Sequence, residues 1–210
     1  GAEALLRWHD DEHGDVPPQV FVPLAEEAGL IHSLGEWVLR TAAAQVVAWR
    51  RAGLPLNVSV NLSARQFYRE DLAQRIVEIV REAGCEPSWL ELEVTETSLL
   101  HDLDAIRRVL HQLREHGFRV AIDDFGTGYS SLTHLKHFPI DTLKIDISFI
   151  ADLETDPGDA AITEAVKADP TLSGAVDAAE VTGAHSWLTS QMSTGPVVDA
   201  LFSVRVKSAL

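Results

Sequence analysis

The sequence predicts an α/β fold in which parallel strands and helices alternate, as in a variant (β/α)8 barrel of the TIM type. Three observations predict it. Short strand-like segments alternate with longer amphipathic ones over the first 150 or so residues, the strands carry polar residues on one face, and several strands end in acidic or amide side chains. Strands and helices in this order form right-handed βαβ units. An open sheet covered on both sides would have strands that are apolar on both faces, so the polar faces favour a barrel.

The helices are predicted from apolar residues that recur at three- and four-residue spacings, the pattern of one buried helix face. Glycine follows each of these segments, as it commonly does at helix ends. The predicted helices cover residues 34–49, 72–80 and 103–113, followed by Gly53, Gly84 and Gly117.

The strands are predicted from alternation of polar and apolar residues. They cover residues 57–62, 89–94, 119–123 and 142–147, and the chain begins inside a further strand that contains Glu3. Five strand–helix units can be counted, whereas a complete barrel needs eight. The sequence therefore predicts an incomplete barrel with two open edges, which invite pairing with other chains.

Composition and charge narrow the classes of function. The chain has 210 residues, a net charge of −15, 46% hydrophobic and 23% charged residues, which is typical of a soluble globular domain. Because so acidic a surface repels phosphate backbones, duplex nucleic acid is not an expected partner. Cys85 is the only cysteine, which fits a reducing compartment such as the cytoplasm. No apolar run approaches the length of a membrane span and no signal peptide opens the chain, so membrane contact from this segment is not expected.

Candidate functional residues lie where the predicted strands end. In a βα barrel, all strand C-termini face the same mouth, where active sites form. Converging carboxylates repel one another unless a cation lies between them, and oxygen-only ligands suit Mg²⁺ or Mn²⁺. Two such ions can support phosphodiester hydrolysis, and a lysine can stabilise developing charge. The residues concerned are Glu3, Asn61, Glu93, Asp123, Asp124, Lys144 and Asp146.

Simpler interpretations remain open for each feature. A single acidic residue at a strand end is ordinarily a cap or a solvated loop residue. The glycine-rich segment 124–131 is either a loop that holds metal ligands or an ordinary turn in which Ser130 caps a helix. The pair His134 and His137 has no third ligand nearby and is interpreted as surface.

Six sequence blocks resemble, in order, those of the EAL domain, a bacterial family of metal-dependent phosphodiesterases that act on cyclic di-GMP. One tripeptide would be weak evidence, whereas six blocks in order over about 150 residues are specific. The blocks are Glu3-Ala4-Leu5-Leu6-Arg7-Trp8, Phe21-Val22-Pro23-Leu24-Ala25-Glu26, Val60-Asn61-Leu62-Ser63, Glu93-Val94-Thr95-Glu96, Asp123-Asp124-Phe125-Gly126-Thr127-Gly128 and Leu143-Lys144-Ile145-Asp146.

The resemblance implies roles for individual residues. Glu3, Asn61, Glu93 and Asp123 would bind the first of two Mg²⁺ or Mn²⁺ ions, and Asp123 would bridge to the second with Asp124 beside it. Lys144 and Asp146 would lie at the nucleophilic water, which makes them catalytic candidates together with Glu3. Leu5 and Arg7 would contact the substrate, and Glu96 would anchor the glycine-rich loop, which in the family is coupled to dimerisation. A homodimer of a larger cytoplasmic signalling protein is the implied assembly.

The resemblance weakens toward the C-terminus. We assign residues 1–160 to the core of the EAL domain and 161–210 to a divergent or disturbed part of the same domain. Glu180 could stand for one glutamate of a later family block, whereas a second glutamate and a glutamine have no counterpart. The strand and helix that precede the EAL tripeptide in the family are also missing from this chain.

Three hypotheses follow for the function. The first is hydrolysis of cyclic di-GMP to linear pGpG at a two-metal site. The second is an inactive EAL-derived fragment that binds the dinucleotide or a protein partner, and the third is a non-functional truncation product.

Overall fold

A seven-stranded sheet forms the centre of the computed structural model, which describes residues 1–100, 102–125, 138–145, 176–177 and 202–206. The spatial order is β8-β7-β6-β5-β4-β1-β9. Adjacent strands from β8 to β1 pair in parallel, and β9 pairs antiparallel with β1. The strands are β1 (Ala2–Leu6), β4 (Val58–Asn61), β5 (Leu90–Thr95), β6 (Arg119–Phe125), β7 (Thr142–Ile145), β8 (Val176–Asp177) and β9 (Phe202–Val206).

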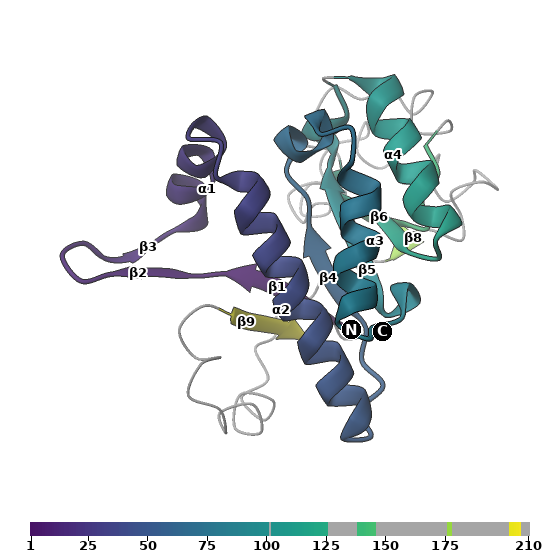
Figure 1. Ribbon diagram of the computed structural model, residues 1–210. Helices are drawn as coiled ribbons and strands as arrows, with labels where there is room; N and C mark the ends of the chain where they lie inside the picture. The colour runs from purple at the N-terminus through teal and green to yellow at the C-terminus, as the bar shows by residue number, and fades with distance from the viewer. Residues whose placement is uncertain (101, 126–137, 146–175, 178–201, 207–210) are drawn as a thin grey trace, which may run out of the picture.

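Three helices cover one face of this sheet: α2 (Ile31–Arg51), α3 (Leu72–Glu82) and α4 (Leu103–Glu115) (Figure 1). Their buried stripes meet the apolar face of the strands, so that Ile79, Leu110, Leu92 and Val120 are all fully buried. The predicted helices and the predicted strands of the first 145 residues are confirmed, with bounds that shift by a few residues. The opposite face of the strands carries the polar residues, as the sequence predicts for a barrel with a polar centre near the strand ends.

A hairpin and a short helix after β1 were not predicted. The hairpin consists of β2 (Trp8–Asp10) and β3 (Gly14–Val16), and α1 (Pro18–Glu27) follows it. In Figure 1 the hairpin projects away from the sheet. Strands of three residues are too short to show alternation, and Pro23 within α1 obscures the helical pattern. The ring of Trp8 meets that of Phe21 edge-on at 5.9 Å and joins the hairpin to α1.

The described residues form a sheet with two ends, as the sequence predicts, and these ends are β8 and β9. The strand β1 is not one of them. All five residues of β1 pair with β9, from Ala2 opposite Val206 to Leu6 opposite Phe202. The sequence of β9, Phe-Ser-Val-Arg-Val, does alternate, but its surroundings hid the signal. Pairing satisfies the backbone groups that an edge strand would otherwise leave exposed.

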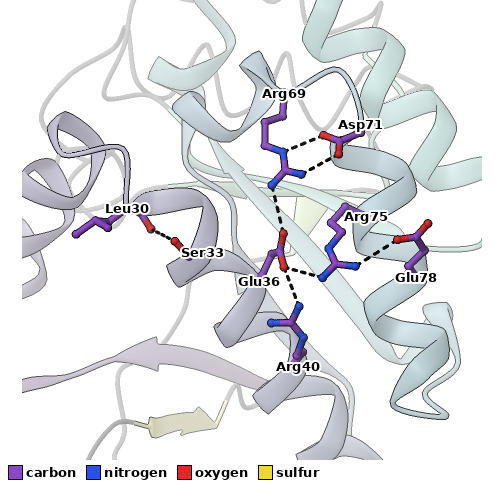
Figure 2. Close-up of polar contacts among 8 residues, drawn as sticks. All are labelled: Leu30, Ser33, Glu36, Arg40, Arg69, Asp71, Arg75 and Glu78. Carbon is purple, nitrogen blue, oxygen red and sulfur yellow. Dashed lines mark hydrogen bonds and ion pairs between the residues drawn. The ribbon is translucent and has the colours of Figure 1, made fainter.

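Glu36 on α2 is the centre of an ion-pair network that joins α2 to α3 (Figure 2). Its carboxylate accepts hydrogen bonds from Arg75 (2.9 Å), Arg40 (2.7 Å) and Arg69 (3.2 Å). Arg69 also forms a two-bond pair with Asp71. The hydrogen bond from Arg75, with help from the other arginines, lowers the pKa of Glu36 from its usual value of 4.5 to about 2.

This network predicts a pH-dependent contribution to stability. Because the pKa of Glu36 is lower in the folded state, its contribution is present above pH 4.5 and is lost as the pH falls toward 2. The arginines are partly exposed, so solvent screening limits the contribution of Glu36 to stability to about 1–2 kcal/mol at neutral pH. In urea titrations, Glu36→Gln should lower the free energy of unfolding by this amount at pH 7. The difference from wild type should shrink between pH 4.5 and pH 2. A constant difference across that range would contradict the account, and the exposed Glu27→Gln is the matched control.

Candidate metal centre

Polar side chains from five neighbouring strands, β1 and β4 to β7, converge at the C-terminal edge of the sheet. Asn61 is the last residue of β4 and pairs across the ladder with Glu93 of β5. Asp123 of β6 lies opposite Thr95, two residues further along β5. Because side chains alternate along a strand, Glu93 and Thr95 share a face, and the register therefore places Asp123 on the same side as Glu93.

The three carboxylates lie close enough to share a cation. One oxygen from each of Glu3, Glu93 and Asp123 lies within 4.8 Å of the others. Asn61 Nδ2 donates a hydrogen bond of 2.9 Å to Glu3 Oε1. The side-chain carbonyl oxygen of Asn61 takes no part in this bond. Glu93 is fully buried and Glu3 is only 6% exposed, whereas Asn61 is exposed. The cluster is therefore sunk into the barrel and open toward the mouth at Asn61.

Lys144 of β7 completes the cluster. Its ammonium pairs with Glu93 Oε1 and lies 3.7 Å from Asp123 Oδ2. Only 12% of its side chain is exposed. One ammonium group thus pairs with two of the three carboxylates, and if all three are ionised they leave an excess of negative charge in a largely buried place.

The pKa of Asp123 reflects this crowding. Burial raises it from 3.8 to about 6, Lys144 opposes the rise, and the negative charges of Glu93 and Asp124 add to it. Carboxylates held close together in a buried site are stabilised by a positive ion. The donor set of carboxylate oxygens and one amide suits Mg²⁺ or Mn²⁺, so the residues fit the ions that the sequence predicts.

A bulge in β6 sets the directions of the two consecutive aspartates. Between the pairs Ile122–Leu143 and Phe125–Ile145, β6 advances three residues while β7 advances two. Asp124 has a φ of 55°, a left-handed conformation that few non-glycine residues adopt. Asp124 is exposed while Asp123 is partly buried. Bulges often re-aim side chains beside active sites, and this one lets neighbours in sequence occupy different positions at the mouth.

A second polar layer lies beneath the carboxylate cluster. Glu91 accepts hydrogen bonds from Thr142 (3.2 Å) and Ser59 (3.5 Å), and Arg119 lies 3.7 Å from it. The alternation in β4 and β5 already placed Ser59 and Glu91 on the polar face. The sequence did not single out Thr142, because its contact with Glu91 of β5 becomes visible only in the structure.

Comparison with known proteins identifies the family. The EAL domain family matches the chain over residues 1–168. The chain belongs to the EAL domain family. The resemblance noted in the sequence is therefore confirmed, as is the TIM-barrel-like α/β fold that solved EAL domains share.

Two relatives of this EAL domain carry the names of enzymes. The bifunctional diguanylate cyclase/cyclic di-GMP phosphodiesterase MucR of Pseudomonas aeruginosa is 47% identical over 169 residues, 80% of this chain and 25% of that protein. The cyclic di-GMP phosphodiesterase PdeR of Escherichia coli is 39% identical over 166 residues, 79% of this chain and 25% of that protein. The EAL domain described here thus spans about a quarter of the length of these curated relatives.

A solved structure shows the same architecture. The PaMucR phosphodiesterase in complex with c-di-GMP superposes with a TM-score of 0.74 at 46% identity, covering 83% of this chain and 71% of that one.

Within the described part of this EAL domain, no helix has both the length and the apolar character needed to cross a bilayer.

The remaining predicted site residues of the EAL domain are placed as follows. Leu5 is partly buried in β1, and Arg7 is exposed between β1 and β2, where its guanidinium donates to the carbonyl of Leu6. Glu96 is buried and begins the short 3-10 helix η3 (Glu96–Leu100) after β5. Asp146, the glycine-rich loop from residue 126 and the pair His134 and His137 lie outside the described residues, as do Glu180 and most of the segment 161–210.

Proposed function

We propose that this EAL domain hydrolyses cyclic di-GMP to linear pGpG at a site that holds two divalent cations. The observation that carries the proposal is the buried cluster of Glu3, Glu93 and Asp123 with the Lys144 ammonium beside it. Support comes from relatives 39–47% identical whose names include cyclic di-GMP phosphodiesterase.

Four residues would hold the first Mg²⁺ or Mn²⁺ ion: Glu3, Asn61, Glu93 and Asp123. Asp123 would also face the second ion, with Asp124, the next residue in the β6 bulge, beside it. When bound, the two ions supply Lewis-acid polarisation of the phosphodiester and lower the pKa of the attacking water. The other catalytic roles are proposed for side chains of this chain.

Lys144 is the proposed catalytic cation of the chain. Its ammonium is held by Glu93 and Asp123 and therefore has a fixed position beside the cluster. From there it can orient the nucleophilic water by a hydrogen bond and neutralise charge that develops on the phosphoryl oxygens. Asp146 is proposed to accept a hydrogen bond from the same water.

Leu5 and Arg7 are the proposed substrate contacts at the mouth. Arg7 extends from the end of the strand that carries Glu3, and its exposed guanidinium bonds only a neighbouring carbonyl among the contacts described. A guanidinium binds phosphate in a two-bond geometry, so Arg7 can exchange this contact for a phosphate of the dinucleotide. Glu96 is proposed to anchor the glycine-rich loop, a homodimer is the proposed assembly in the parent protein, and the cytoplasm is the proposed location.

The proposal predicts a defined product. With excess Mn²⁺, the chain should convert cyclic di-GMP to pGpG by cleavage of one phosphodiester, and a chelator should abolish the reaction. Chromatography of the products together with calorimetry of dinucleotide binding separates the hypotheses. Binding without any linear product, with Mn²⁺ demonstrably bound, would instead establish a dinucleotide-binding module.

A further inference from the structure

The turn that follows β4 is fixed by hydrogen bonds that its backbone N–H groups donate. Leu62 N–H donates to the Glu93 carbonyl at 2.8 Å and extends the β4–β5 ladder by one residue. Ser63 N–H then donates to Gln66 Oε1 at 2.9 Å, while Ser63 Oγ accepts from Arg65 N–H at 3.1 Å. These reciprocal bonds form a capping box at the start of the 3-10 helix η1 (Ala64–Tyr68).

The Ser63 hydroxyl also reaches a different part of the chain. Its Oγ donates to Oε1 of Glu26 in α1 at 2.5 Å. The hydroxyl accepts from Arg65 N–H and has one hydrogen of its own, so the donation to the carboxylate fixes its rotor. A hydroxyl–carboxylate bond this short is charge-assisted and about twice as strong as a neutral one. Glu26 therefore ties α1 directly to the turn after Asn61.

Two contacts with α2 hold the far side of the same turn. Gly35 lies so close to Gln66 that any Cβ there would overlap the side-chain amide. Arg69, which caps η1, donates to Glu36 Oε1 at 3.2 Å (Figure 2). The turn from Ser63 to Arg69 is thus held by α2 on one side and by Glu26 on the other.

We propose that Glu26 and Ser63 are positioning residues of the metal centre, acting through Asn61. Asn61 lies two residues before Ser63 and is the one neutral member of the proposed ligand set. Asn61 is exposed at the mouth, so besides its hydrogen bond to Glu3 its direction depends on how the backbone leaves β4. The Leu62–Glu93 bond couples this turn to the strand residue whose carboxylate belongs to the cluster. The inference rests on the proposed function for the identity of the ion.

The test compares Glu26→Ala with Glu27→Ala, a change of equal charge on the same helix at an exposed position. In Glu26→Ala, the amide hydrogens of Leu62 and Ser63 should exchange at least tenfold faster, measured by NMR without metal. The Mn²⁺ dissociation constant from electron paramagnetic resonance should rise about tenfold or more, the range typical for partners of metal ligands. Glu27→Ala should match wild type in both, and Ser63→Thr, which keeps the hydroxyl, should stay closer to wild type than Ser63→Ala.

Each contrary result has a distinct meaning. Unchanged exchange at Leu62 and Ser63 in Glu26→Ala would overturn the claim that Glu26 holds the turn. Faster exchange with unchanged Mn²⁺ affinity would overturn the positioning role and leave only a structural one. Absence of Mn²⁺ binding by the wild type would reject the proposed function. If the wild type binds Mn²⁺ and Glu26→Ala leaves amide exchange unchanged, only the role of Glu26 is rejected.

Discussion

Replacing Lys144 with methionine should reduce the turnover number for cyclic di-GMP by a factor on the order of 10²–10³, the usual effect of removing one strong electrostatic contact to a transition state. The methionine keeps most of the volume of the buried lysine stem and removes the charge. Mn²⁺ should bind the variant at least as tightly as it binds wild type, because the Lys144 ammonium competes with the cation for Glu93 and Asp123.

The two readouts distinguish a catalytic lysine from a structural one. Steady-state kinetics with saturating Mn²⁺ gives the turnover number, and calorimetry gives the metal affinity. Arg51→Met removes an exposed cation at the end of α2 and should change neither. Loss of Mn²⁺ affinity in Lys144→Met, in parallel with activity, would mean that the lysine supports the fold of the site rather than the reaction.

Replacing Asp123 with asparagine should weaken Mn²⁺ binding by about two orders of magnitude or more and abolish measurable hydrolysis. The substitution keeps the shape of the side chain but removes a negative charge proposed to lie between two cations. Calorimetry and product analysis measure the two effects, with the exposed Asp11→Asn on the hairpin as a control for net charge. Equal Mn²⁺ affinities in Asp123→Asn and wild type would exclude Asp123 from the metal centre.

Much of the architecture follows from local patterns. The apolar stripe in 34–49 becomes α2, and the alternation around Ser59 and Glu91 places these residues on the polar face of β4 and β5. Glu3, Glu93 and Asp123 come together as predicted, because parallel strands bring their C-terminal ends to one edge. Whether they ligate a metal stays a prediction.

Other features depend on pairings that no local pattern contains. The antiparallel contact of β9 with β1 joins residues about 200 positions apart, and the β6 bulge at Asp123 and Asp124 exists only relative to β7. Glu26 lies in a helix that the sequence did not predict, and only the fold brings it to Ser63. Both residues belong to blocks that resemble the family, but nothing in the sequence pairs them.

A crystal structure of the chain with Mn²⁺, with anomalous diffraction recorded at the manganese edge, tests the central claim most directly. The account predicts an anomalous peak coordinated by Glu3, Asn61, Glu93 and Asp123, and a second peak that shares Asp123. Lys144 should remain beside the cluster without ligating either ion. Manganese bound only at other carboxylates, with the Lys144 ammonium still paired to Glu93 and no peak at the strand ends, would contradict it.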